Sequence, residues 1–395
     1  MKKSPLDGCI VLDLGRYIAG PFCAMLLGDM GADVIKVEQT NGDDGRRMKP
    51  AIGDLSTYFM ISNRNKRSIT LNFKKPKGKE MLLKLIEKAD VLVENFRPGV
   101  MERLGLGYEY LHKLNPRLVV VSVTGFGQDG PYAQRPAFDS VAQAMGGLMN
   151  QTGDPDGRPV PAGTWVGDYG AGTYAAFGAA VALFERERTG LGQQVDVALL
   201  DTIFSWLRTS VPDFLLFGIK HSRKGARDLY RCPVGAFPSN DGYIYITATT
   251  QGQFEGVVRS AGHPELATDP RFITEADRLA NSAELNRIVT EWTSAHSGEE
   301  LLAALNAADV PCAPIADIEQ VVNNPQLRHR QNIITVKTSA GQELPLPGIP
   351  VKLSETPGAV RMAPPATGEH NAEVYGSMLG LSKFELDVLR QQGVI

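Results

Sequence analysis

Short apolar runs rich in β-branched residues alternate with helical stretches through the first third of the chain, and this alternation constrains the fold more than any other feature. Residues 9–14 and 33–38 have the pattern of strands, and between them Pro21 occupies the first position of a helix that ends at Gly31. Strands that alternate with helices in this way form a parallel sheet covered by helices. The sequence therefore predicts an α/β fold, with further strands at residues 68–73, 91–94 and 118–124 and helices near residues 78–88 and 100–114.

The middle of the chain has a different composition. Residues 168–187 are rich in Ala and Gly and carry larger apolar side chains at helical spacing, which predicts one tightly packed helix followed by a strand at residues 194–200. From Pro233 onward the pattern is that of an α+β domain. One strand and three helices are expected there, at residues 243–248, 253–261, 283–296 and 299–308.

These changes divide the chain into three parts. We expect a large α/β domain over residues 1–220 and a small α+β domain over residues 221–330. A C-terminal segment, residues 331–395, is expected to return to the large domain and to end in a helix at residues 383–392.

The balance of charges disfavours several partners. The chain has 41 Lys and Arg against 44 Asp and Glu, so its net charge favours neither nucleic acid nor an anionic membrane. No apolar run reaches the roughly 20 residues of a membrane span, and the start, with Lys2 and Lys3, lacks the apolar core of a signal peptide. We therefore expect a cytoplasmic protein. The four Cys and six His show no paired spacing, which predicts neither a disulfide framework nor a metal site.

A glycine motif follows the predicted strand at residues 118–124. Gly125, Gly127 and Gly130 have the GxGxxG spacing of a dinucleotide fingerprint. The fingerprint also requires a helix that begins there and a second strand that ends in Asp or Glu, but Pro131 and Pro136 interrupt the segment. Hydride transfer with a nicotinamide cofactor is therefore only a weak alternative for the function.

Basic side chains gather near the predicted strand ends and loops. Ligands bind outside the carboxyl ends of parallel strands, where Lys, Arg and helix N-termini neutralise phosphates. The pattern predicts a site for a polyanionic ligand, and for each single cation the alternative is a solvated surface position. The residues are Lys66, Arg67, Lys74, Lys75, Arg97, Arg103 and Arg135.

Asp168 lies between Gly167 and Tyr169 at the predicted start of the Ala-rich helix. One interpretation is an N-cap, which is a common role for Asp at a helix start. The other is a nucleophile, because a helix N-terminus would keep the carboxylate ionised and the neighbouring glycines leave room for a substrate.

With these residues in view, the chain resembles class III (CaiB/BaiF) CoA-transferases, the family of formyl-CoA transferase and carnitine CoA-transferase, over nearly its whole length. The resemblance rests above all on residues 27–38 (LGDMGADVIKVE), 94–99 (ENFRPG) and 167–169 (GDY). Shorter matches support it at residues 5–8, 11–14, 19–21, 65–69 and 188–193.

The resemblance implies a large Rossmann-like lobe formed by both chain ends, a smaller central lobe, and a homodimer of two interlocked chains. It also implies the chemistry. Asp168 would attack the thioester of an acyl-CoA to form an aspartyl anhydride, and the released CoA would then form a thioester with Asp168. An acceptor carboxylate would take up the CoA by the reverse steps, without a tightly bound cofactor and without metal.

The family's CoA contacts, carried over by position, fall on Tyr17, Ile18, Ala19, Leu71, Asn72, Phe73, Lys74, Asn95, Phe96, Arg97 and Arg103. Ile18 stands where formyl-CoA transferase has Gln, so we expect an acyl pair other than formyl and oxalyl. Asp139, Arg46 and Arg135 are candidates for substrate binding or assistance. Arg46, Arg47 and Arg135 permit a dicarboxylate such as succinate as a substrate, which would enter as succinyl-CoA.

Two other functions stay open. The related α-methylacyl-CoA racemases have a His immediately before the position that matches Asp139, and this chain has Phe138 there, so a second base is lacking. A non-catalytic CoA-binding homologue is the other alternative, and the presence of Asp168 argues against it.

Overall fold

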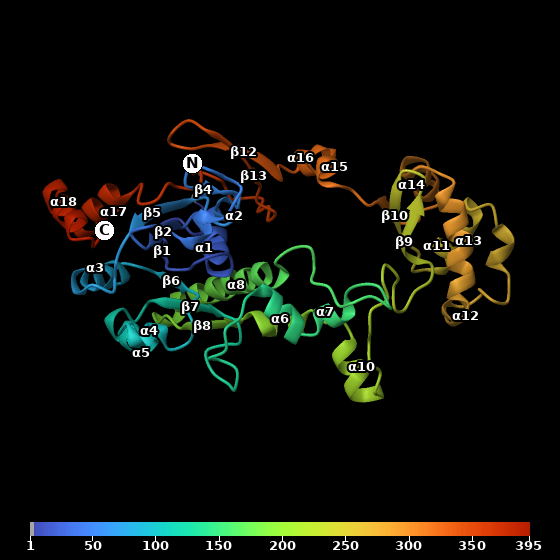
Figure 1. Cartoon of the computed structure of the whole chain (residues 1–395), viewed down its shortest axis with the longest axis horizontal. Coiled ribbons are helices and arrows are strands. Elements are labelled where there is room, and N and C mark those ends of the chain that lie inside the picture. The colour runs from blue at the N-terminus through green and yellow to red at the C-terminus, as the bar shows by residue number, and fades with distance from the viewer. Residues whose placement is uncertain (1–3) are drawn as a thin grey trace. The chain divides into compact units, whose positions relative to one another are not determined.

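The computed structural model describes residues 4–395, so the predicted absence of a signal peptide lies partly outside it. The chain divides into two compact units (Figure 1). The large unit comprises residues 4–148, Pro161–Leu215 and Pro325–Ile395, and the small unit comprises Met149–Val160 and Leu216–Asn324. This division differs from the expected one in three segments: residues 149–160 and 216–220 join the small unit, and residues 325–330 join the large unit.

A six-stranded parallel sheet forms the centre of the large unit. Its central strands are Val- and Ile-rich and buried, as expected for a sheet covered on both faces. The α/β architecture with a parallel sheet is therefore confirmed. The strand order is β5 (Lys66–Thr70), β2 (Asp33–Glu38), β1 (Ile10–Asp13), β6 (Val91–Glu94), β7 (Val119–Thr124) and β8 (Gln194–Ala198).

Helices α1 (Ala19–Asp29) and α8 (Val166–Thr189) pack together on one face of this sheet. Small residues bring their backbones close, because a Cβ added at Gly172 of α8 would lie 2.8 Å from the carbonyl oxygen of Ala19. The Ala-rich composition of α8 is thus the requirement of a close helix contact.

The other face is covered by helices from both ends of the chain, which share one apolar core (Figure 1). They are α3 (Pro76–Ile86), α4 (Val100–Arg103), α5 (Tyr108–Leu114), α17 (Asn371–Leu379) and α18 (Lys383–Gln391). The single helix predicted at residues 100–114 is wrong, because Gly105 takes a positive φ of 65° and separates α4 from α5.

The C-terminal segment covers the free edge of β5. The backbone N–H of Thr70 donates to the Asn371 side chain, and the Tyr375 hydroxyl donates to the Thr70 carbonyl. The backbone of Ser68 exchanges hydrogen bonds with His370 in the same way. Strand β5 is therefore paired with β2 on one side and saturated by side chains and backbone on the other.

Shorter elements complete the large unit. The structure shows two two-stranded ribbons, β3 (Ala51–Ile52) with β4 (Leu55–Ser56) and β12 (Ile333–Lys337) with β13 (Glu343–Pro347). The short helices are η1 (Asp44–Arg47), α2 (Thr57–Met60), α6 (Asp139–Met145), α7 (Leu148–Gln151), α9 (Leu199–Ser205), α10 (Ser210–Phe217) and α16 (Pro325–His329), of which α7 and α10 cross the boundary between the units.

The small unit has its own core around Phe237, Phe254 and Phe272. Its antiparallel sheet has the order β11 (Cys312–Pro314), β10 (Gly242–Thr247) and β9 (Val234–Ser239). Its helices are α11 (Gln251–Ser260), η2 (Pro264–Ala267), α12 (Glu275–Ala280), α13 (Ser282–Ser294), α14 (Gly298–Ala307) and α15 (Ile318–Asn323). Across residues 4–395, no helix is both long and apolar enough to cross a membrane.

Candidate active site

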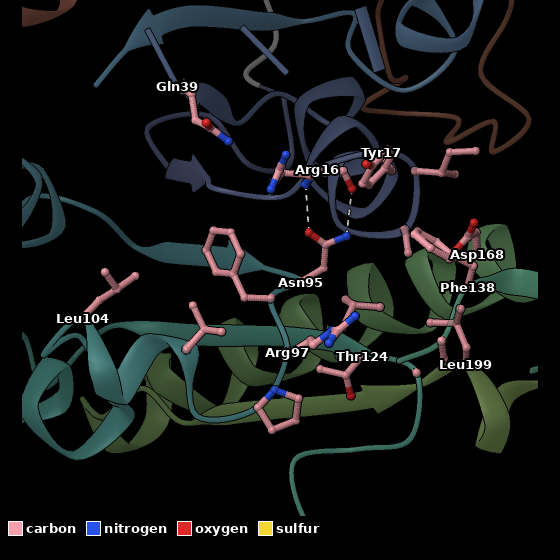
Figure 2. A pocket seen from close by; sticks show the side chains of 18 of the residues that line it. Arg16, Tyr17, Gln39, Asn95, Arg97, Leu104, Thr124, Phe138, Asp168 and Leu199 are labelled. Carbon is pink, nitrogen blue, oxygen red and sulfur yellow. Dashed lines mark hydrogen bonds between the residues drawn. The ribbon is translucent and has the colours of Figure 1, made fainter. Parts of the chain in front are cut away.

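A cavity of about 630 Å³ opens in the large unit where the sheet strands end. Its walls come from the segments that follow β1, β2, β5, β6 and β7 at their carboxyl ends, the usual place for a ligand in a parallel sheet. Asp168 at the start of α8 and Leu199 at the start of α9 line it from the other side (Figure 2). The large unit alone therefore forms a site of a size suited to a small-molecule ligand.

The turn that follows β1 contributes Arg16 and Tyr17 to the cavity wall. Tyr17 takes a positive φ of 64°, a conformation that costs energy for a non-glycine residue. The side chain of Asn95, just after β6, accepts from the Arg16 backbone N–H and donates to the Arg16 carbonyl, both at 2.8 Å (Figure 2). The turn is thus held from the neighbouring strand.

Asp168 is not the N-cap of its helix. Helix α8 begins at Val166, its N-cap is Trp165, and Asp168 is the third helical residue, so the N-cap interpretation is wrong. The capping acceptor is Asp139 at the start of α6, whose Oδ1 accepts from the N–H of Gly167 at 2.7 Å and of Asp168 at 3.3 Å. Across residues 4–395, no donor contacts the carboxylate oxygens of Asp168 itself.

The pKa of Asp168 is raised to about 7. Burial is the larger cause, and the negative charge of Asp139 is the second. The expectation that the helix N-terminus keeps this carboxylate fully ionised is therefore wrong at neutral pH, because desolvation and a like charge oppose the helix dipole. A carboxylate of this kind is poised between its two protonation states at physiological pH.

Aromatic side chains surround Asp168. Tyr169 contacts Phe22 edge to face, and Tyr17 meets Phe138 in the same way at a centroid distance of 5.8 Å. Tyr58 also lines the cavity, and burial followed by the charge of Asp168 raises the pKa of its hydroxyl. The surroundings of the carboxylate are therefore mainly apolar, with neutral hydroxyls.

The cavity contains all but one of the residues predicted to contact CoA. These are Tyr17, Ile18, Ala19, Leu71, Asn72, Phe73, Lys74, Asn95, Phe96 and Arg97. Arg103, at the end of α4, does not line the cavity, and its contact with CoA stays a prediction.

The predicted basic crevice is only partly formed. Lys74, Arg97 and Arg135 line the cavity, and Arg135 stacks on Tyr132 at 4.0 Å. Lys66 is completely buried against Asp13 instead. The remaining predicted cations are held elsewhere: Arg67 by Asp33 and Glu373, and Lys75 by the Gln392 carbonyl.

Arg46 also differs from the expectation. Its guanidinium is buried, forms two hydrogen bonds of 2.7 Å with Glu38, and stacks on Phe59 at 3.7 Å. It is not among the residues that line the cavity. The prediction that Arg46 binds the substrate is therefore wrong, because its guanidinium is already paired with Glu38 inside the protein.

Several lining residues were not predicted to belong to the site: Arg16, Tyr58, Thr124 and Leu199. Arg16 could have been identified, since it lies in the turn beside Tyr17. Tyr58 and Leu199 carry no signal in the sequence, because only the tertiary fold brings α2 and α9 to the strand ends.

The GxGxxG segment forms a loop and not a helix start. The Gly127 N–H donates to the Thr124 hydroxyl and the Gln128 N–H to Asp196, and the next helix, α6, begins only at Asp139. The geometry of a dinucleotide fingerprint is therefore not formed there. Across residues 4–395, no group of three His, Cys, Asp or Glu side chains is arranged to bind a metal ion.

Known proteins resemble this chain over nearly its whole length. The chain is 40% identical to the beta subunit of succinyl-CoA–L-malate CoA-transferase from Chloroflexus aurantiacus, over 99% of this chain and 98% of that protein. It is 38% identical to formyl-CoA:oxalate CoA-transferase from Streptomyces avermitilis over 99% of both chains. A crystal structure of a CAIB/BAIF family protein from Brucella suis, 36% identical, superposes with a TM-score of 0.86 over 95% of this chain and all of that one.

The sequence model of CoA-transferase family III matches residues 6–371, which is nearly the whole chain. The match includes the motifs at residues 27–38, 94–99 and 167–169 and all six strands of the parallel sheet. The chain therefore belongs to CoA-transferase family III.

Proposed function

We propose that this protein transfers CoA from an acyl-CoA to a free carboxylic acid, with Asp168 as the nucleophile. The observation that carries the proposal is the position of the Asp168 carboxylate, which lines a cavity of about 630 Å³ and receives no hydrogen bond from residues 4–395. An uncommitted carboxylate among apolar and aromatic groups is a better nucleophile than a solvated one, because it has little hydration to lose.

The reaction begins when an Asp168 oxygen attacks the thioester carbonyl. The C–S bond breaks, CoA leaves as a thiolate, and an aspartyl anhydride remains. The thiolate then attacks the aspartyl carbonyl, which releases the donor acid and leaves a CoA thioester on Asp168. The acceptor carboxylate attacks this thioester, the C–S bond breaks, and a second aspartyl anhydride forms with release of the CoA thiolate. The thiolate then attacks the acceptor's carbonyl in this anhydride, which forms the new acyl-CoA and regenerates the Asp168 carboxylate.

Water must be excluded while the anhydride exists. The aromatic contacts around Asp168, from Tyr17, Phe138 and Tyr169, support this requirement. Asp139 supports the nucleophile indirectly, since it holds the N-terminus of α8 that carries Asp168.

For the substrates we propose succinyl-CoA as the donor and a short hydroxylated dicarboxylic acid as the acceptor. Relatives with 38–40% identity are named for succinyl-CoA with L-malate or D-citramalate. Arg97 and Arg135 in the cavity supply cations for CoA phosphates and for the second carboxylate of such acids, and Arg16 lines the cavity while paired with Asp44. The buried Ile18 in the cavity favours these acids over formate and oxalate.

A racemase receives less support. Phe138, immediately before Asp139, has no ionisable group that could act as a base. The Asp139 carboxylate already accepts hydrogen bonds from Gln143 and the α8 backbone. This leaves Asp168 without a partner base on the opposite face of a substrate carbon.

We also propose that two copies interlock into a homodimer. Phe177 and Phe184 on α8 are 67% and 72% exposed in the single chain, and Leu215 and Phe217 on α10 are 74% and 71% exposed. Apolar side chains in such numbers mark a surface that another chain covers. Because one relative is named as a beta subunit, a mixed assembly with a similar chain is the alternative. Light scattering of the purified protein at micromolar concentration distinguishes the two: a dimer would support the homodimer, and a monomer would refute it and favour the mixed assembly.

The function is tested with succinyl-CoA and a panel of acids, L-malate, D-citramalate, oxalate and acetate, with mass spectrometry of the acyl-CoA products. We expect L-malyl-CoA or D-citramalyl-CoA, and addition of hydroxylamine should convert Asp168 to its hydroxamate during turnover. Transfer to oxalate alone would contradict the substrate assignment. A racemised 2-methylacyl-CoA without transfer to any acid would replace the proposal by the racemase.

A further inference from the structure

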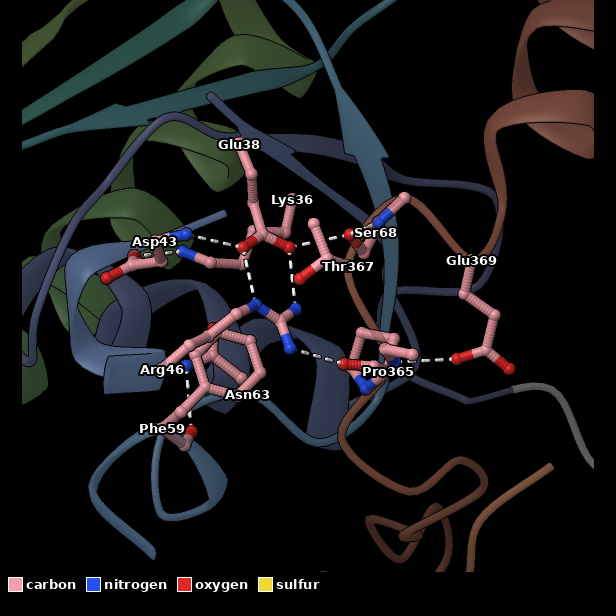
Figure 3. A network of polar contacts seen from close by, with 12 residues as sticks. Lys36, Glu38, Asp43, Arg46, Phe59, Asn63, Ser68, Pro365, Thr367 and Glu369 are labelled. Carbon is pink, nitrogen blue, oxygen red and sulfur yellow. Dashed lines mark hydrogen bonds and ion pairs between the residues drawn. The ribbon is translucent and has the colours of Figure 1, made fainter. Parts of the chain in front are cut away.

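A network of charged side chains lies buried beside the turn that follows β1, outside the cavity. It contains three acids and three bases, so its charges balance: Asp13, Glu38, Asp43, Lys36, Arg46 and Lys66. Around Glu38, the carboxylate accepts hydrogen bonds from the Asp43 backbone, the Ser68 hydroxyl and Arg46 (Figure 3).

The part of this network around Lys36 and Asp13 binds the backbone of the turn. Lys36 Nζ donates to the Gly15 carbonyl at 2.9 Å and lies 3.0 Å from the Asp43 carboxylate. Asp43 in turn accepts a hydrogen bond from the Gly45 N–H at 2.8 Å. Asp13 accepts from the Gly15 N–H at 2.8 Å. Lys36 and Asp13 thus hold Gly15 at the start of the turn, with Lys36 paired to Asp43, while Asn95 holds Arg16.

The turn needs such support, because Tyr17 has a left-handed backbone that only its surroundings can maintain. Arg16 and Tyr17 both line the cavity, whereas Lys36 and Asp43 do not. Lys36 is fully buried and Asp43 nearly so, which leaves neither within reach of a ligand. Any effect of the pair on the site must therefore act through the turn.

Both groups of the pair are held in their charged forms. Burial alone would lower the pKa of Lys36, but Asp13 and Asp43 raise it above its ordinary value. Burial alone would raise the pKa of Asp43, but Lys36 and the backbone of Gly45 and Tyr17 lower it. A buried ion pair often adds no stability over apolar residues of the same size. In addition to any effect on stability, Lys36 of this pair binds the backbone of the turn.

We propose that Lys36 and Asp43 are positioning residues of the acyl-CoA site, which fix the turn so that Arg16 and Tyr17 face the ligand. The proposal rests on the proposed function, in that the cavity binds CoA thioesters. It assigns affinity for CoA to residues that cannot touch it.

The test replaces the pair by apolar residues of similar size, Lys36→Met with Asp43→Leu, which leaves the rest of the network balanced. We expect the KM for the acyl-CoA and the Kd for CoA, measured by calorimetry, to rise about tenfold, the equivalent of roughly one lost hydrogen-bonded contact, while kcat changes less than about threefold. The thermal midpoint should stay near that of the unmodified protein.

A matched control is the other buried pair of the same unit, Arg64 with Asp29, joined by hydrogen bonds of 2.6 and 3.0 Å. Neither residue lines the cavity. The variant Arg64→Met with Asp29→Leu should leave the KM and the Kd unchanged even where it shifts the thermal midpoint. Equal changes of KM in the two double variants would overturn the proposal, because a general loss of packing would then explain both.

Asp43→Asn keeps an oxygen for the Gly45 N–H and weakens the ion pair with Lys36, so it tests the proposal if the double variant does not fold. A KM rise of about threefold is expected, since a neutral hydrogen bond is weaker than a charged one, and an unchanged KM would overturn the proposal. If the unmodified protein binds no CoA in calorimetry, the proposed function itself fails. Equal CoA affinity in the unmodified and altered proteins would sink only the positioning role.

Discussion

Among the buried and partly buried acidic side chains of the large unit, two groups are arranged in opposite ways. Asp13, Glu38 and Asp43 each lie against a lysine or arginine inside the sheet. Asp139 and Asp168 lie near each other at the start of α8, and no cation pairs with either within residues 4–395. Asp139 is stabilised by backbone N–H groups and Gln143, which leaves Asp168 as the carboxylate without a partner.

This difference distinguishes carboxylates that stabilise the fold from a carboxylate that is available for a reaction. A carboxylate paired with a buried cation stays ionised and rigid, and it gains little by attacking a substrate. A carboxylate beside a like charge and away from water has a raised pKa and a high drive to form a new bond. On the proposed function, the paired carboxylates belong to the scaffold of the large unit, and the unpaired carboxylate of Asp168 carries the reaction.

The largest expected effect comes from removing the unmatched carboxylate. Asp168→Ala should lower the rate of CoA transfer at least about a thousandfold, since no other described carboxylate lines the cavity. The control is Asp201→Ala, an exposed carboxylate on α9 outside the cavity, which should keep the unmodified rate. Product formation followed by mass spectrometry decides, and residual transfer above about one tenth would contradict the nucleophile assignment.

Removing a matched cation should affect stability instead. Lys66→Met leaves Asp13 buried with its closest partner lost, so the free energy of unfolding should fall by about 3–5 kcal/mol. Urea denaturation measures this change. Lys77→Met, at an exposed pair with Glu80, should change the stability by less than about 0.5 kcal/mol. Equal losses in the free energy of unfolding for Lys66→Met and Lys77→Met would show that the buried charges do not stabilise the large unit.

The pH dependence of transfer tests the raised pKa. Because only the ionised Asp168 is a nucleophile, kcat/KM should rise with pH and level off above about 7, and it should fall about tenfold for each pH unit below that value. The profile is measured between pH 5.5 and 8.5 with a stability check at each pH. A rate that is flat down to pH 5.5 would show that Asp168 has the pKa of an ordinary aspartate.

The smallest effect is expected for Asp139→Asn. The amide oxygen can still accept from the α8 backbone, but the negative charge beside Asp168 is gone. Because that charge is only the second cause of the raised pKa, the acidic limb of the profile should move to lower pH by less than about one unit. Movement to higher pH would mean that Asp139 does not act on Asp168 through its charge.

The sequence predicted those parts of the fold that local patterns determine. The strands at residues 33–38 and 91–94 agree with β2 and β6, because short β-branched runs bounded by loops leave no other interpretation. Strand β5 was placed at residues 68–73 but spans Lys66–Thr70, because a lysine is not expected in a buried strand. Only the fold shows that Asp13 neutralises it.

The site was predicted unevenly for the same reason. Asp168 and the residues around Asn95 lie in motifs that can be recognised along the chain. Tyr58 and Leu199 come from short helices, and Arg46 has the same local character as a substrate-binding arginine. Which cations face a ligand and which are neutralised inside the protein depends on contacts between distant segments, and periodicity contains no information on these.

The covering of β5 by the C-terminal segment also has a consequence for synthesis. His370 and Ser68 are separated by 302 positions in the sequence, so at roughly 5–20 residues per second the ribosome needs about 15–60 s after the strand is made before its cover exists. During that time the strand presents a row of unpaired backbone groups to other nascent chains. Expression of this protein should therefore depend on chaperones that shield a sheet edge until translation ends.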